Sequence, residues 1–193
     1  MWMPLHGVIA ALFLFGLHRF QNKDFSSFVL TLILTFVWGE IFHYYSHRAI
    51  HLRALYWIHR EHHRSLVNSP FTAISFSFQE KFFFSLGIFS VPALVDTVYS
   101  LNFYGIATWY IIYLISNSFS HANFEAKSSD FIATIGRYLT STTYHSLHHS
   151  RFINNYGLAT RFLDRTHKSE WADYEKVFQS LHQDGPLHML KQK

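Results

Sequence analysis

The chain has no cysteine among its 193 residues and few charged residues. Without cysteine there is no disulfide framework, no cysteine-based zinc finger and no thiol nucleophile. Charged residues make up 15%, below the roughly 25% typical of soluble domains, and the formal net charge is only +4. So small a charge excess, in a chain that is 49% hydrophobic, argues against a nucleic-acid partner and against intrinsic disorder.

Long apolar runs are what the sequence does contain. About 20 helical residues span the roughly 30 Å of a bilayer's hydrocarbon core. Runs of this kind cover residues 26–45, 82–99 and 101–119, and a weaker run covers 3–17. They predict an all-α integral membrane protein with four transmembrane helices, in one domain over residues 1–193. A soluble all-α protein with buried helices is the alternative.

The placement of charges predicts the topology of these helices. Fourteen of the 16 lysines and arginines lie between residues 47 and 81 or after Ser120. Positively charged loops stay in the cytoplasm, so both segments are predicted to be cytoplasmic. The expected location is a bacterial inner membrane or the endoplasmic reticulum, with the functional site on the cytoplasmic face. The second and third long runs are almost contiguous, which predicts a tight helical hairpin with Asp96 near its turn.

Histidine is abundant, with 15 residues, and ten of them fall in clusters. His43, His47 and His51 are spaced four residues apart, so a helix would stack them on one face. Glu40 lies one turn before them, and His121 directly follows the last apolar run.

The pattern His-x-x-His-His occurs twice, at residues 59–63 and 145–149. Each residue of a helix advances about 100°, so the first, fourth and fifth positions fall within one arc. Each copy is therefore expected to present three imidazoles to one point.

Clustered imidazoles indicate metal binding. Protonated histidines would repel one another, whereas neutral imidazoles are good ligands for Fe, Zn, Cu and Ni. Nine or ten nitrogens exceed the capacity of one ion, so two ions are predicted, and unrelated surface histidines are the alternative. Glu40 and Glu80 are predicted to accept hydrogen bonds from imidazole N–H groups, and His43 to be a tenth ligand or a supporting neighbour. The predicted metal ligands, which are also the catalytic residues, are His47, His51, His59, His62, His63, His121, His145, His148 and His149.

The order of these motifs resembles the fatty acid hydroxylase/sterol desaturase superfamily of integral-membrane, histidine-box oxygenases. The resemblance covers about residues 36–165. The matching motifs, in order, are Glu40-x-x-His43-Tyr-Tyr-x-His47-Arg-x-x-His51, His59-x-x-His62-His63, His121-Ala-Asn, His145-x-x-His148-His149 and Asn155-Tyr156-Gly157.

This resemblance implies a four-helix membrane bundle whose cytoplasmic helical cap holds a non-haem centre of two metal ions. The ions are normally iron, with zinc an alternative in purified protein, and O2 is the co-substrate. Such proteins hydroxylate or desaturate fatty acyl chains or sterols with electrons from a separate cytochrome b5-like or ferredoxin-like donor. A non-catalytic or transport-type membrane metal-binding protein is the competing function.

Two features depart from the family's pattern. The usual His-Pro-x-Glu after the second box is Ser77-Phe78-Gln79-Glu80 here, and the usual Trp-Asp motif is Leu163-Asp164. Some relatives have a second histidine four residues after the His121 position, where this chain has Glu125, either a carboxylate ligand or a surface acid.

A further apolar face, formed by Trp171, Tyr174, Phe178 and Leu181, predicts a helix that lies on the membrane or packs on the cap.

Overall fold

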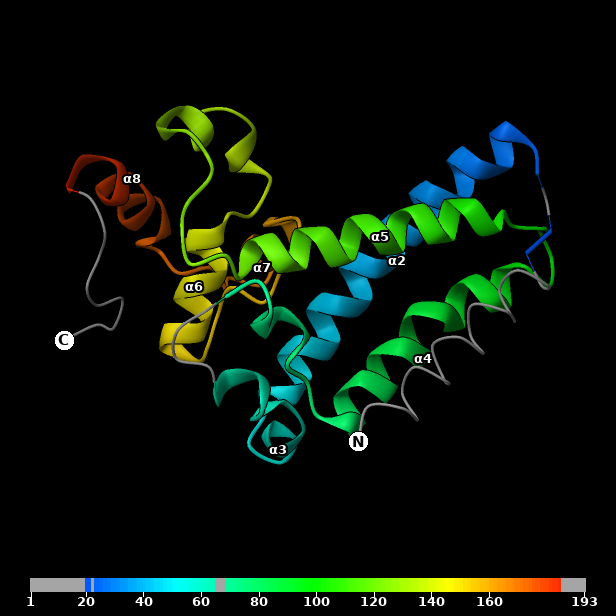
Figure 1. Cartoon of the computed structure of the whole chain (residues 1–193), viewed down its shortest axis with the longest axis horizontal. Coiled ribbons are helices and arrows are strands. Elements are labelled where there is room, and N and C mark those ends of the chain that lie inside the picture. The colour runs from blue at the N-terminus through cyan, green and yellow to red at the C-terminus, as the bar shows by residue number, and fades with distance from the viewer. Residues whose placement is uncertain (1–19, 22, 65–68, 185–193) are drawn as a thin grey trace. The chain divides into compact units, whose positions relative to one another are not determined.

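The computed structural model describes residues 20, 21, 23–64 and 69–184 (Figure 1). These residues form seven α-helices and no strand, apart from the isolated antiparallel bridges Gln21–Asn102 and Leu139–Thr160. The all-α fold class is therefore confirmed. The predicted first span, residues 3–17, lies outside the described residues.

The helices group into two compact units. The first unit contains residues up to 39 together with 81–113, and the second contains 40–80 together with residues from 114 onward. The boundaries between the units, after residues 39, 80 and 113, each fall inside a helix. Three helices therefore contribute to both units. The α-helices are α2 (Phe25–Ile50), α3 (Tyr56–His59), α4 (Phe78–Val95), α5 (Phe103–Ser120), α6 (Thr142–Arg151), α7 (Phe162–Thr166) and α8 (Tyr174–Asp184). The 3-10 helices are η1 (His62–Arg64), η2 (Thr72–Ile74), η3 (Ser129–Phe131) and η4 (Ile135–Arg137).

Among the described residues, α2 and α4 are the two helices long and apolar enough to cross a membrane. The exposed fractions of Ile33, Phe36 and Val37 on α2 are 56%, 41% and 49%. Such a row of exposed apolar side chains is what a lipid-facing helix requires. The last predicted span, residues 101–119, is the helix α5, whose last turns contain Ser116 and Asn117. The four-span topology and the cytoplasmic position of the histidines stay predictions.

In the first unit, close approaches hold the apolar helices together. The indole N–H of Trp38 on α2 donates to the carbonyl oxygen of Gly87 on α4, at 2.9 Å. Gly39 lies against the ring of Trp109 on α5, where an added Cβ would be 2.0 Å from Cζ2. A larger residue than glycine at position 39 would force these two helices apart.

The predicted hairpin between α4 and α5 is confirmed, and side chains define its turn. The Asp96 carboxylate accepts from the Leu101 N–H at 2.7 Å. The Asn102 side-chain oxygen accepts from the N–H groups of Tyr104, at 2.8 Å, and Gly105, at 3.2 Å. Asn102 therefore caps the start of α5, as asparagine does at helix N-termini.

The core of the second unit forms where α8 packs on α6. Tyr174 and Phe178 from α8 are fully buried, and they pack with Phe131, Tyr144 and Leu147. Of the two interpretations of the apolar face near the C-terminus, packing within the protein is the one confirmed for these two aromatic residues.

A buried ion pair links the segments around this core. The fully buried Arg161 guanidinium donates to Glu170 at 2.6 Å and to Glu175 at 2.8 Å. It also donates to the Gly136 carbonyl oxygen at 2.6 Å and stacks over the Tyr174 ring, 4.5 Å from the centroid. A buried guanidinium is tolerated because every side of it has a partner.

Replacing Arg161 by methionine should lower the free energy of unfolding by about 3 kcal/mol, because breaking a buried ion pair leaves desolvated groups unpaired. Arg165 contacts the same two carboxylates, but its side chain is 42% exposed. R165M is thus the matched control, with an expected loss below about 1 kcal/mol. Thermal unfolding in detergent measures both, and equal losses would contradict the assignment.

Candidate metal centre

The nine predicted ligands gather into two groups. The five-histidine group comprises His47, His51, His59, His63 and His148. The four-histidine group comprises His62, His121, His145 and His149. Within each group the nitrogen atoms able to bind a metal lie within 4.8 Å of one another. His43 is outside both groups, although its ring centroid is 5.1 Å from that of His47.

Both His-x-x-His-His segments contribute to both groups, so the expectation that each copy serves one point is wrong. His148 belongs to the five-histidine group, whereas its neighbour His149 belongs to the other. Adjacent residues on α6 point about 100° apart, which directs them to different centres. The first copy is not one helix either, because α3 ends at His59 and η1 begins at His62.

Nitrogen separations in the five-histidine group match those of ligands around one ion. Nε2 of His47 and Nε2 of His59 are 3.2 Å apart. Nε2 of His63 lies 3.2 Å from the Nε2 atoms of both His51 and His148. Metal–nitrogen bonds of about 2.1 Å separate neighbouring ligands by roughly 3.0–3.4 Å, depending on whether the geometry is octahedral or tetrahedral.

The tautomers of His47 and His59 indicate that a cation belongs between their rings. The Nδ1–H of His47 donates to the Tyr156 carbonyl oxygen at 3.0 Å, and that of His59 donates to Glu80 at 2.5 Å. In a neutral ring, a protonated Nδ1 leaves a lone pair on Nε2. The facing Nε2 atoms of these two rings would repel each other, and a metal ion between them removes the repulsion.

The four-histidine group has the same arrangement. Nε2 of His145 lies 2.9 Å from Nε2 of His121 and 3.0 Å from Nε2 of His149. The Nδ1 of His121 is 3.3 Å from the Thr72 hydroxyl, whose own proton goes to the Ser69 carbonyl oxygen. The His121 Nδ1 is therefore the donor in this contact, and its Nε2 presents a lone pair to the group.

Burial keeps these imidazoles neutral. Desolvation lowers the pKa of His51 to about 3 and that of His121 to about 4. The pKa values of His62, His145 and His148 fall well below the usual range, chiefly through burial and then through neighbouring imidazoles. Neutral rings are the form that binds metal, so the site is ready for an ion at neutral pH.

One loop orients three ligands of the five-histidine group through its carbonyl oxygens. Asn154 accepts from His148 Nδ1 at 2.7 Å, and Tyr156 accepts from His47 Nδ1. The backbone of Phe152 is the hydrogen-bond partner of His51. Phe152 and Asn154 have φ of 65° and 63°, and this left-handed backbone turns alternate carbonyls toward the imidazoles. Asn155-Tyr156-Gly157 is among the motifs matched in the sequence, but sequence reasoning assigned this loop no role, although its Asn-Asn pair is a signal for left-handed conformations.

Asp164 holds that loop in place. Its carboxylate accepts from the backbone N–H groups of Tyr156, at 3.0 Å, and Gly157, at 2.7 Å. It also accepts from the hydroxyls of Tyr144, at 2.9 Å, and Ser169, at 2.7 Å. The Leu163-Asp164 departure from the family's Trp-Asp motif thus keeps the residue that makes the contacts.

The three glutamates that the sequence analysis considered make different contacts. Glu80 contacts an imidazole as expected, since it accepts from His59. Glu40 does not, because its carboxylate accepts from the Ala159 and Thr160 backbone and from the Thr160 hydroxyl. Glu125 belongs to neither histidine group and accepts from the N–H and hydroxyl of Thr143 in the first turn of α6.

These features define a class of protein: an all-helical chain with apolar, membrane-compatible helices and two adjoining groups of neutral imidazoles suited to metal ions. The chain belongs to the fatty acid hydroxylase family, whose model matches residues 32–169. This match confirms the resemblance seen in the order of the histidine motifs.

Several plant proteins are similar to this chain. The chain is 36% identical to very-long-chain aldehyde decarbonylase GL1-5 of Oryza sativa subsp. indica over 134 residues, which are 65% of this chain and 21% of that protein. It is 30% identical to GL1-7 of Oryza sativa subsp. japonica, over 78% of this chain and 25% of that protein. It is 34% identical to very-long-chain aldehyde decarbonylase CER1 of Arabidopsis thaliana, over 62% and 20%. The chain thus spans only a fifth to a quarter of these proteins, and no solved structure matches it.

Removing one histidine from each group should remove different ions. Elemental analysis of protein purified without oxygen should give about two metal ions per chain, since two ions are needed to use this many imidazoles. H148A and H145A should each hold about one ion, because they disrupt different groups. H182A is the control, as His182 lies outside both groups. One ion in the unaltered protein, or loss of metal in the control, would contradict the two-ion site.

Asp164→Asn should weaken metal binding at the five-histidine group by about 10–100-fold, the usual effect of losing an outer contact to the ligands. The amide can replace only part of the four hydrogen bonds, so the loop carbonyls shift away from His47 and His148. Chelator competition separates this loss from retained binding at the four-histidine group. Asp130→Asn is the control, because Asp130 is exposed on η3. Equal weakening at both groups would show that Asp164 acts only on overall stability.

Proposed function

We propose that the protein is a membrane-bound non-haem di-iron oxygenase that hydroxylates or desaturates a C–H bond of a lipid, such as a fatty acyl chain or a sterol. The observation that carries the proposal is the adjacency of the two groups. His63 of one group and His149 of the other have ring centroids only 4.5 Å apart. Two ions held by these groups would be close neighbours, as a joint reaction at one substrate carbon requires.

Iron, when bound, would supply the redox chemistry that an unactivated C–H bond requires and that side-chain acids and bases lack. The chain's own residues hold and orient that centre. Carbonyl oxygens and Glu80 fix the tautomers of four rings in the five-histidine group, and aromatic rings cover the imidazoles. Phe76 stacks on His62, with centroids 4.7 Å apart, and Phe152 lies 5.4 Å from His63. These rings exclude water from the ligands.

A second candidate reaction follows from the names of the relatives. Those proteins are called very-long-chain aldehyde decarbonylases. A long-chain aldehyde is therefore a second substrate to test at the same histidines. For either reaction, we propose that electrons come from a separate cytochrome b5-like or ferredoxin-like donor.

Lipid mass spectrometry tests the proposal. The iron-loaded protein is supplied with membrane lipids or a long-chain aldehyde, O2 and each type of donor with its reductase. The expected product gains one oxygen or loses two hydrogens, whereas decarbonylation would instead shorten the aldehyde by one carbon. H148A should reduce product to background and H182A should leave it near normal. Two bound metal ions without any O2-dependent product would favour a structural or transport-type metal protein.

A further inference from the structure

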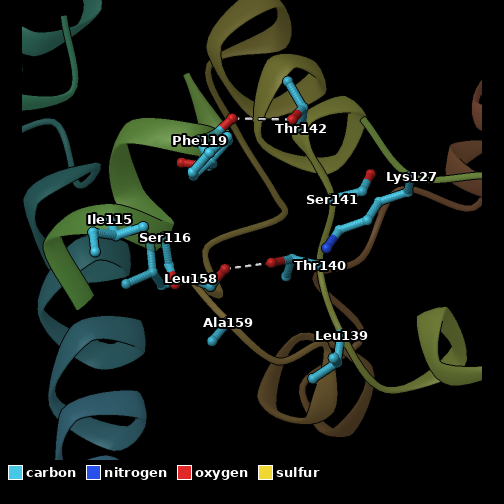
Figure 2. A pocket seen from close by; sticks show the side chains of 11 residues that line it. Ile115, Ser116, Phe119, Lys127, Leu139, Thr140, Ser141, Thr142, Leu158 and Ala159 are labelled. Carbon is cyan, nitrogen blue, oxygen red and sulfur yellow. Dashed lines mark hydrogen bonds between the residues drawn. The ribbon is translucent and has the colours of Figure 1, made fainter. Parts of the chain in front are cut away.

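We propose that a cavity in the second unit binds the carboxylate end of a long-chain acyl compound. The inference deepens the proposed function and rests on it, since it takes a lipid to be the substrate. The cavity has a volume of about 250 Å³ and lies between the end of α5, the start of α6 and residues 158–159 (Figure 2). Nothing in the histidine groups forms its wall.

One part of the wall suits a hydrocarbon chain. Ile115 and Phe119 lie one turn apart on α5, and Leu139 and Leu158 complete the apolar lining. The side chains of Ile115 and Phe119 are 52% and 57% exposed. Exposed apolar groups that border a cavity gain free energy when a ligand's methylene groups cover them.

The other part of the wall carries hydroxyl groups, some of which are already committed. The Thr140 hydroxyl donates to the Leu158 carbonyl oxygen. Those of Thr142 and Ser120 donate to the carbonyl oxygens of Phe119, at 3.0 Å, and Asn117, at 2.7 Å. Their protons are therefore not available to a ligand.

Donors do remain in the cavity. The Ser141 oxygen accepts from the Tyr144 N–H and the Tyr174 hydroxyl, so its own proton is left for a ligand. Lys127 extends into the cavity, and its nitrogen lies beside Thr140 (Figure 2). Among the described residues no carboxylate forms an ion pair with this ammonium group, which lies 5.4 Å from the centroid of the Phe131 ring.

An ammonium group and a hydroxyl proton beside an apolar wall fit an amphiphile whose head only accepts hydrogen bonds. A carboxylate has this character, and a charge-assisted bond to lysine is stronger than a neutral one. The same segments carry the four-histidine group, because Ser120 precedes His121 and Thr142 lies one turn before His145. An acyl compound bound in this cavity would thus lie on the same backbone segments that carry the histidines of the four-histidine group.

A measurement of ligand binding tests this proposal more directly than a measurement of enzymatic turnover. Purified full-length protein in detergent is titrated with octadecanoate and octadecanol, each competing with a fluorescent fatty acid. Lys127→Met should weaken octadecanoate binding at least about ten-fold, because one charge-assisted hydrogen bond is lost. Octadecanol binding should be unchanged, and Lys127→Arg should retain octadecanoate binding. Lys176→Met, at an exposed lysine on α8, is the matched control and should bind like the unaltered protein.

Several results would overturn the assignment. One is unchanged octadecanoate affinity in Lys127→Met, and another is equal weakening for octadecanoate and octadecanol. Phosphatidate in the same competition separates a phospholipid phosphate from a fatty carboxylate, so dependence on Lys127 for phosphatidate alone would also reject the proposal. Because the titration needs no electron donor or O2, an inactive protein that still shows the Lys127 dependence would contradict only the proposed function.

Discussion

The structure depends on nine imidazole nitrogens whose lone pairs converge in a buried space. Protonation would relieve the contact between two such nitrogens, but burial and neighbouring imidazoles oppose protonation of nearly every ring. A metal ion meets the requirement without adding a proton, and the separations of 2.9–3.2 Å between Nε2 atoms are those of ligands to one ion. The second unit is therefore built around its ligands: α2, α3, η1 and α5 each end or begin at or beside a ligand histidine, and α6 carries three.

Metal ligands of this kind must be held rigidly, and here most of the groups that hold them are backbone carbonyl oxygens. Side-chain carboxylates would bring negative charge into the site, whereas carbonyl oxygens accept the Nδ1–H protons without adding charge. The left-handed loop near Asn154 supplies three such carbonyls, and the Asp164 carboxylate, outside the ligand set, fixes the loop. The negative charge of Asp164 is thus kept one residue layer away from the metal ligands, whereas Glu80 contacts the ligand His59 directly.

The sequence predicted the parts of the protein that repeat at a helical period. Apolar runs indicated α2, α4 and α5 within a few residues, and histidine spacing indicated all nine residues of the two groups. It did not predict how the residues divide between groups, because that depends on which group each face of α6 meets and, for the first copy, on the turn at Arg60 between α3 and η1. The sequence also did not predict the partners of Glu40, because Thr160 is 120 residues away in the chain. Long-range contacts of this kind leave no period in a sequence.

The division of ligands explains why the His-x-x-His-His pattern occurs twice. His62 and His63 have ring centroids 5.7 Å apart with planes at 87°, and His148 and His149 have 5.7 Å and 88°. The first copy gives two histidines to the five-histidine group and one to the other, and the second copy does the reverse. The two copies are therefore related as the halves of a two-ion site. The His47–His51 pair has His121 and Glu125 as its counterpart, and Glu125 is bound to Thr143 instead. Among the described residues, the four-histidine group thus has one protein ligand fewer than the five-histidine group.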